Sequence, residues 1–133
     1  MLRFLLDTNA LLRRLTNPKK LSREQTRILD DLERQGQPLA ISAMTLVEVT
    51  VLQAGRRTRT GGDLMEILRL IDGNPLCRIL PVTVEIAADV AVLGATLRDP
   101  ADCTIVATAR VHRLKLLTSD QRIIDSGLTS VVE

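Results

Sequence analysis

Short apolar runs alternate along this chain with longer segments whose apolar residues recur at helical spacing. The short runs are typical of buried strands, and they fall at residues 2–6, 39–41, 77–80, 116–117 and 130–132. Because a helical segment separates each strand from the next, we expect the strands to run parallel in one sheet. The pattern therefore predicts an α/β fold, in which helices flank a central parallel sheet of four to five short strands.

Capping residues indicate the helical segments, in addition to the periodicity of the apolar residues. Ser22 and Ser42 stand where the N-caps of two helices are expected, and Gly36, Gly55 and Gly73 follow the ends of three helical segments. The predicted helices cover residues 8–15, 22–34, 43–54, 63–72, 83–97, 100–113 and 120–126.

The helix that follows Ser42 is apolar along most of its length. Its spacing places four residues on one apolar side: Met44, Val47, Val51 and Leu52. Glu48 lies within the same helix between two valines, where a buried and unpaired carboxylate would cost several kcal/mol. Either Glu48 faces the surface or it has a partner that neutralises it.

Two of the predicted strands are followed by an aspartate, Asp7 near the start of the chain and Asp120 near its end. Parallel sheets bind ligands beyond the carboxyl ends of their strands, so both could share one crevice, which Glu48 and Asp102 could join. No cationic partner is evident, and like charges about 4 Å apart cost roughly 4 kcal/mol at an effective dielectric near 20. A bound divalent cation would remove that repulsion.

Each aspartate also has a purely structural interpretation. Asp7 and Asp120 stand where the N-caps of the following helices are expected, and Asp99 precedes Pro100 at a first helical position. Aspartate is a preferred N-cap, and the helix dipole favours its charge. Taken one at a time, capping is the simpler explanation.

Composition narrows the class of protein. The 133 residues suit one domain, residues 1–133, and its core must be aliphatic because Phe4 is the only aromatic residue. The chain shows no secretory signal or membrane-spanning apolar run, so we expect a cytoplasmic protein in which Cys77 and Cys103 are free thiols. His112 lies near Arg110 and Arg113 on an expected exposed helical face, and we assign it no catalytic role.

The order and local sequence of the acidic residues resemble those of PIN-domain nucleases, and most closely the VapC-type toxins of bacterial toxin–antitoxin pairs. The resemblance is carried by residues 5–9, 42–49, 99–102, 105–109 and 117–120. It implies a catalytic and metal-binding set of four acids: Asp7, Glu48, Asp102 and Asp120. It also implies three supporting residues: Asn9, Asp99 and Thr118. Cys103 departs from the pattern, since close relatives often carry arginine there, but all four carboxylates are in place.

Clustered carboxylates suit Mg²⁺, or alternatively Mn²⁺, whereas zinc would favour the histidine and cysteine ligands that are scarce here. We expect Asp7 and Asp102 to hold the principal ion, and Asp120 and Glu48 to bind it through water or to complete a second site. The predicted reaction is hydrolysis of a phosphodiester by metal-activated water, which leaves a 5′-phosphate and a 3′-hydroxyl.

Evidence for the substrate is weaker in the sequence. Five arginines are candidates for phosphate contacts, although solvation explains them equally well: Arg13, Arg14, Arg56, Arg57 and Arg59. The near-absence of aromatic side chains favours a structured RNA over a stacked single strand. The family resemblance implies an RNA substrate such as tRNA or rRNA, inhibition of translation, a homodimer, and a cognate antitoxin that occludes the acidic crevice in a higher assembly.

Two other functions stay open. A Mg²⁺-dependent phosphotransfer domain, of the receiver or phosphatase type, would use one aspartate as a phosphoryl acceptor. The residues after Asp7 lack the second aspartate of the phosphatase-type pair, and the expected lysine at a late strand end is missing. A noncatalytic RNA-binding module would keep the fold and bind RNA without cleaving it.

Overall fold

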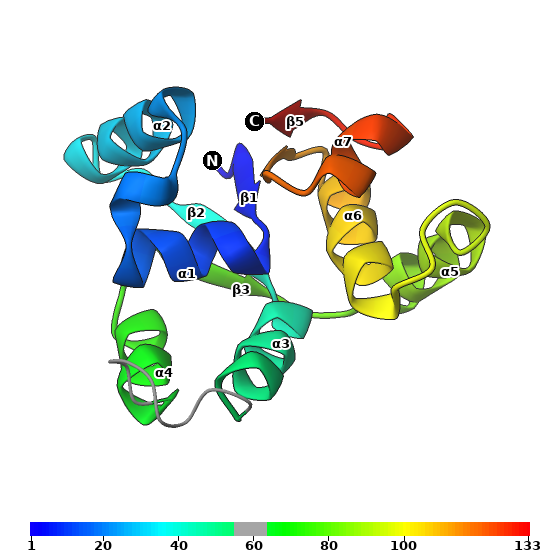
Figure 1. Cartoon of the computed structure of the whole chain (residues 1–133), viewed down its shortest axis with the longest axis horizontal. Coiled ribbons are helices and arrows are strands. Elements are labelled where there is room, and N and C mark those ends of the chain that lie inside the picture. Colours follow the sequence, from blue (N-terminus) through cyan, green and yellow to red (C-terminus); the bar gives the residue numbers. More distant parts are fainter. Residues whose placement is uncertain (55–63) are drawn as a thin grey trace.

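A parallel five-stranded sheet forms the centre of the molecule, with helices on both faces (Figure 1). The computed structural model describes residues 1–54 and 64–133. The strands are Phe4–Leu6 (β1), Leu39–Ser42 (β2), Cys77–Leu80 (β3), Lys115–Leu117 (β4) and Val131–Val132 (β5). Their order across the sheet is β3-β2-β1-β4-β5, and all four neighbouring pairs are parallel. The predicted α/β class with a parallel sheet is confirmed.

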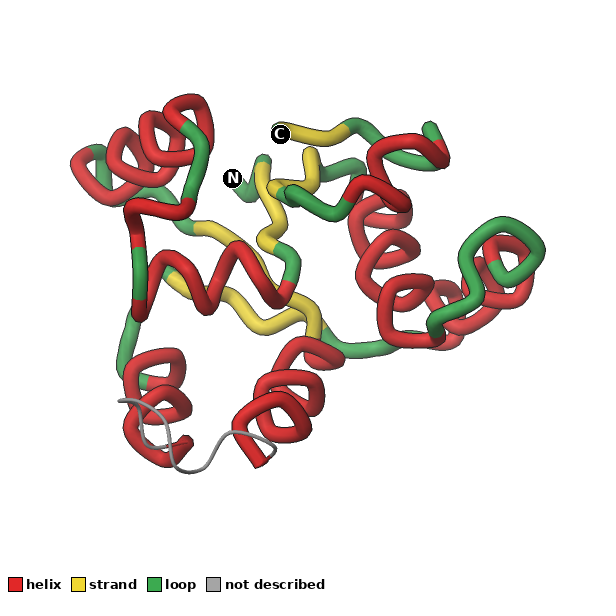
Figure 2. Tube along the Cα trace, in the orientation of Figure 1, coloured by secondary structure: helices red, strands yellow, loops and turns green. Residues whose placement is uncertain are grey.

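Helical segments separate the strands along the chain (Figure 2). The described residues form seven α-helices: Thr8–Thr16 (α1), Arg23–Arg34 (α2), Ala43–Ala54 (α3), Leu64–Asp72 (α4), Val84–Leu93 (α5), Pro100–His112 (α6) and Gln121–Ser126 (α7). A single 3₁₀ turn, η1 (Pro18–Lys20), joins α1 to α2. Within the described ranges, no helix has the length and apolar character needed to span a membrane.

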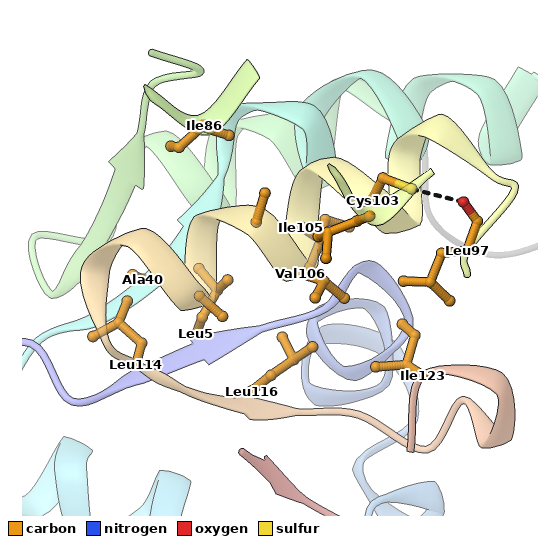
Figure 3. Packing of buried hydrophobic residues seen from close by; sticks show 13 residues of the cluster. Leu5, Ala40, Ile86, Leu97, Cys103, Ile105, Val106, Leu114, Leu116 and Ile123 are labelled. Carbon is orange, nitrogen blue, oxygen red and sulfur yellow. Dashed lines mark hydrogen bonds between the residues drawn. The ribbon is translucent and has the colours of Figure 1, made fainter. Parts of the chain in front are cut away.

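Neighbouring residues of a strand point to opposite faces of the sheet, which gives the protein two apolar layers. Leu5 and Leu116 belong to the cluster that packs against α5 and α6, shown in Figure 3. Leu6 and Leu117 belong to the cluster on the other face, which includes residues of α1, α2 and α4. Because both faces of the central strands are covered, these strands meet solvent at their ends.

Helix α5 ends earlier than its apolar pattern predicts. The sequence suggested a helix to residue 97, but α5 stops at Leu93 and Gly94 caps it. Glycine is a poor helix former, and the turn that follows brings Leu97 into the core, where it is 5% exposed. Cys103 donates its thiol hydrogen to the Leu97 carbonyl across 3.0 Å (Figure 3). Cys77 and Cys103 are free thiols, as predicted.

The side of α3 that faces the core differs from the apolar side that spacing suggested. Thr45 and Val49 are fully buried, whereas Val47 and Val51 are 53% and 66% exposed. Because α3 is apolar around most of its circumference, periodicity could not select its buried side. The apolar residues left in water are available for a protein contact.

The strand order reverses beside β1. The chain passes from β1 to β2 and β3 on one side, and then crosses back to β4 and β5 on the other. The carboxyl ends of β1 and β4 therefore lie together at the topological switch point, the usual ligand site of an open α/β sheet. Asp7 and Asp120 follow these two strands.

Candidate active site

Asp7 is held rigidly at the end of β1. Its backbone N–H donates to the Leu117 carbonyl of β4 at 3.1 Å, and its Oδ1 accepts from the Ala10 N–H at 2.7 Å as the N-cap of α1. The residue is only 6% exposed. Burial raises the pKa of its carboxyl, and the Asp120 charge adds to that effect, although hydrogen bonds from Thr118 and Ala10 oppose it. Asp7 thus caps a helix, and burial disfavours the charged form of its carboxyl.

Thr118 links the two strand ends. Its side chain is fully buried, and its hydrogen bond to Asp7 favours the charged form of that carboxyl. Its Oγ1 also accepts from the Asp120 N–H at 3.0 Å. Asp120 in turn caps α7, where its Oδ1 accepts from the Arg122 N–H at 2.9 Å. The hydroxyl of Thr118 therefore sets the spacing between two of the acids.

Asp102 enters the same region from the first turn of α6. Asp99 caps this helix and accepts from the N–H groups of Ala101 at 2.8 Å and Asp102 at 3.4 Å. Burial raises the pKa of the Asp102 carboxyl to about 6, and the negative charges of Asp99, Asp120 and Glu48 contribute, with Arg122 opposing them. The influence of these charges shows that Asp102, Asp120 and Glu48 share one electrostatic environment.

Glu48 reaches this environment from α3 and has a partner that the sequence did not reveal. The Thr8 hydroxyl donates to Glu48 Oε1 across 2.6 Å. Thr8 Oγ1 also lies 3.1 Å from Thr45 Oγ1, and both threonines are buried. Because a hydroxyl carries one proton, Thr45 supplies the second hydrogen bond when Thr8 donates to the carboxylate. These two threonines fix Glu48 from one side.

Gln25 supports the site from beneath. Its side chain is fully buried, and its Nε2 donates to the carbonyls of Thr118 at 3.2 Å and Val132 at 2.9 Å. Gln25 also completes a capping box with Ser22 at the start of α2. This box was visible in the sequence as serine followed three residues later by glutamine, but its contact with the strand ends was not.

Arg122 supplies a cation where the sequence suggested none. Its Nη2 lies 3.2 Å from Asp120 Oδ2 and 3.5 Å from Asp102 Oδ2. Burial alone would raise the pKa of Asp120, but the hydrogen bonds and charge of Arg122 outweigh that effect and lower it. The position of Arg122, two residues after a capping aspartate, was the only signal in the sequence.

The four acids supply carboxylate oxygens, which are the donor atoms that a hard divalent cation prefers. In residues 1–54 and 64–133, no group of three or more acidic, histidine or cysteine side chains stands close enough to enclose a metal ion. Mg²⁺ commonly binds through one or two carboxylates and keeps several waters, so a preformed cage is not required. Burial raises the pKa of the Asp7 and Asp102 carboxyls, and a cation bound to their oxygens would stabilise the charged form of both.

The remaining predicted residues have different surroundings. Asn9 is exposed in the first turn of α1, and the charge of Arg13 lowers the pKa of Asp7. Arg14 forms ion pairs with Asp30 and Glu33, each at 2.8 Å, so a phosphate contact would compete with two acids. The other three predicted arginines lie outside the described residues: Arg56, Arg57 and Arg59.

A parallel α/β domain with carboxylates gathered at its switch point defines a class of protein suited to metal-assisted chemistry on phosphate esters. Residues 4–126 match the PIN domain, and the chain belongs to that family. Proteins of this family are typically nucleases that bind divalent metal. No curated protein matches the sequence.

Solved structures resemble the chain over nearly its whole length. A toxin–antitoxin complex from Klebsiella pneumoniae is 26% identical with a TM-score of 0.67, covering 97% of this chain and 95% of that chain. FitAcB from Neisseria gonorrhoeae is 26% identical with a TM-score of 0.69, covering 98% and 96%. DNA-bound VapBC from Salmonella typhimurium shares the fold, with a TM-score of 0.73 at 18% identity, covering 99% and 98%. The predicted family resemblance is confirmed.

Proposed function

We propose that the protein is a divalent-metal-dependent endoribonuclease, the toxin of a toxin–antitoxin pair that acts in the cytoplasm and inhibits translation. One observation carries the proposal: acids from separate elements act on one another beside the switch point, where burial and the charges of Asp120 and Glu48 help to raise the pKa of Asp102 to about 6. Such crowding is unfavourable for folding, because each buried charge loses hydration and repels its neighbours. A cation that binds there offsets both costs.

Within this proposal, Asp7 and Asp102 hold Mg²⁺ or Mn²⁺, and Asp120 and Glu48 act through water or at a second ion. A divalent cation bound there supplies Lewis acidity toward a phosphate oxygen and lowers the pKa of a bound water. Thr8 fixes the Glu48 carboxylate, and Thr118 fixes both Asp7 and the backbone of Asp120. Carboxylates held in this way can orient a nucleophilic water and accept its proton.

The position of His112 supports direct hydrolysis. His112 is exposed in the last turn of α6, whereas Asp102 lies in the first turn. Ten residues of helix separate them by about 15 Å, so the imidazole is out of reach of a group that reacts beside Asp102. We therefore expect that water attacks the phosphorus. The products should then carry a 5′-phosphate and a 3′-hydroxyl.

Arg13 supports an RNA phosphate contact in the described part of the chain. Its charge acts on Asp7, so it lies close enough to attract an anion toward the acidic edge. We keep Arg56, Arg57 and Arg59 as predicted contacts and propose tRNA or rRNA as the substrate class. Because Phe4 is the only aromatic residue, recognition through phosphates and RNA shape is favoured over base stacking.

The proposal includes a cognate antitoxin. A cavity of about 260 Å³ lies between α1, α2 and α4, and its lining combines Leu11, Leu15 and Leu70 with the charged residues Arg14 and Glu33. An apolar cleft with a polar rim suits an amphipathic segment of a partner. The Klebsiella pneumoniae relative is a toxin–antitoxin complex, which supports this choice of occupant.

The proposal also includes a homodimer. Helix α3 exposes Val47 and Val51, and α5 exposes Val84 and Val92 at 88% and 68%. Exposed apolar residues gathered on helices mark protein contacts more often than isolated ones do. Sedimentation of the purified protein tests this part, and Val84→Glu with Val92→Glu is expected to shift a dimer toward monomer.

Cleavage of RNA tests the proposed activity. Purified, antitoxin-free protein is incubated with total RNA and Mg²⁺, beside an EDTA control and the Asp7→Asn and Asp102→Asn variants, and fragment 5′ ends are mapped. Asp72→Asn, an exposed acid at the end of α4, serves as the matched loss of charge. We expect discrete 5′-phosphate fragments from the wild type and Asp72→Asn alone.

Other results would favour a different function. Cleavage that persists in EDTA would contradict the metal-dependent mechanism. Binding of RNA without cleavage under any divalent metal would favour the noncatalytic module. A stable acyl phosphate on Asp7 would favour phosphotransfer, although the buried, capping position of Asp7 argues against it.

A further inference from the structure

The Arg122 guanidinium stands between two acids that come from different helices. Its Nη2 lies 3.2 Å from Asp120 Oδ2 and 3.5 Å from Asp102 Oδ2, and its Nε lies 3.4 Å from Asp120 Oδ1. The two carboxylate side chains are 15% and 19% exposed, whereas that of Arg122 is 72% exposed. A largely exposed cation thus lies over two largely buried anions.

The backbone explains why Arg122 reaches this position. Its own N–H is the donor that Asp120 caps, so the residue lies in the first turn of α7, beside the carboxylate. The guanidinium needs only to fold back over the helix start to reach Asp120, and Asp102 of α6 then falls within its span. No other ion pair reaches Asp102 or Asp120 among the described residues.

We propose that Arg122 is an internal counter-ion, which competes with the divalent cation for the carboxylates of Asp102 and Asp120. This inference rests on the proposed metal-dependent function and goes beyond it. The guanidinium offsets the repulsion between the acids while the metal is absent, and it must leave Asp102 before a cation can bind there. Because Arg122 is exposed, each contact is weak and leaving is easy.

The competition sets the metal affinity of the site. Removing the positive charge frees both carboxylates, so Arg122→Gln is expected to bind Mn²⁺ about three- to tenfold more tightly than the wild type at fixed ionic strength. Arg122→Lys keeps the charge without the planar fork and should fall between them. Lys115→Gln is the matched control, because it removes one exposed positive charge at the opposite end of β4.

Isothermal titration with MnCl₂ measures these four affinities, after circular dichroism has shown that each variant is folded. Equal or weaker Mn²⁺ binding by Arg122→Gln than by the wild type would overturn the proposal that Arg122 is a counter-ion. If Asp102→Asn still abolished Mn²⁺ binding in that case, the proposed metal site would be unaffected. Absence of Mn²⁺ binding in both the wild type and Arg122→Gln would overturn both ideas together.

A second measurement follows the guanidinium itself. The ¹⁵N–¹H signal of Arg122 Nε reports its contact with the acids without reference to activity. Addition of Mg²⁺ should shift this signal in the wild type toward its position in a solvated arginine, and Asp102→Asn should remove the response. A signal that does not move while Mg²⁺ binds would show that Arg122 does not leave and would overturn the proposal.

Discussion

The two ends of the sheet carry charges of opposite sign, which are exposed to water at one end and largely buried at the other. At the amino ends of β1 and β4, Arg3 and Lys115 are exposed, and Arg3 lies over the Phe4 ring at 5.2 Å. At the carboxyl ends, Asp7 is 6% exposed and burial raises its pKa. The amino end keeps charge in water, as most surfaces do, whereas the carboxyl end buries like charges at a cost that stability alone does not explain. The difference supports the proposal that the carboxyl end is the functional site.

Neutralising Asp7 should give the largest effect. Asn retains the capping oxygen but cannot hold a cation as a carboxylate does, so Asp7→Asn should reduce RNA cleavage by roughly 10³-fold or more. The melting temperature of the metal-free protein should stay level or rise, because a buried charge has been removed. Single-turnover cleavage and thermal unfolding measure the two effects.

Lys115→Gln removes a charge at the other end of β4 and is the control for Asp7→Asn. It should change neither cleavage nor stability by more than a small margin. If Asp7→Asn retained cleavage but unfolded at a lower temperature, Asp7 would be a structural cap and the contrast between the two ends would have no functional meaning.

Removing the Thr8 hydroxyl should give the next largest effect. Thr8→Val takes away the 2.6 Å hydrogen bond to Glu48 and leaves the buried Thr45 hydroxyl without that partner. We expect cleavage to fall about 10- to 100-fold, by analogy with partners that orient metal ligands, with a loss of about 1–3 kcal/mol in stability. Thr16→Val, in the last turn of the same helix, is the control. Equal cleavage by the two variants would contradict the proposed role of Glu48 in cleavage.

The stability of the metal-free protein should depend on pH in a direction that the acidic end sets. Asp102 has a pKa of about 6 in the folded protein, whereas an aspartate in the unfolded chain loses its proton near pH 3.8, so the folded state binds more protons between these values. The free energy of unfolding should therefore fall by about 1–3 kcal/mol as pH rises from 4 to 6. Denaturant titrations should show this slope, and Asp102→Asn or saturating Mg²⁺ should flatten it.

The smallest effect is expected at Asp99. Asn caps α6 about as well as Asp, so Asp99→Asn should alter stability by less than about 0.5 kcal/mol. It removes one of the charges that raise the pKa of Asp102, which should therefore fall. A ¹³C titration of the Asp102 carboxyl measures the shift, and an unchanged value would show that the acids are more weakly coupled than the structure indicates.

The strands and their acidic ends could be predicted because short apolar runs and the residues that follow them are local features. Asp7 and Asp120 stand directly after β1 and β4, and the parallel arrangement brings those ends together. Their capping function could also be predicted, and both aspartates do cap helices. The capping interpretation is confirmed, and the function at the shared strand ends stays a proposal that capping does not exclude.

The partners of these acids could not be predicted, because they depend on contacts between distant residues. Thr8 and Glu48 are separated by 40 positions, and Arg122 and Asp102 by 20. For a threonine in a helix or an arginine in a first turn, no local sequence feature predicts such a contact. The buried side of α3 could not be predicted for another reason. Apolar residues lie on most sides of this helix, so their spacing does not indicate which side faces the core.

Location of the metal tests the account most directly. Crystals of the wild-type protein soaked in Mn²⁺ should show an anomalous difference peak at the carboxyl ends of β1 and β4, within coordination distance of Asp7 and Asp102. Crystals of Asp102→Asn should lack the peak. A wild-type map without Mn²⁺ at this end, under conditions in which the protein cleaves RNA, would contradict the claim that its buried acids exist to hold a catalytic cation.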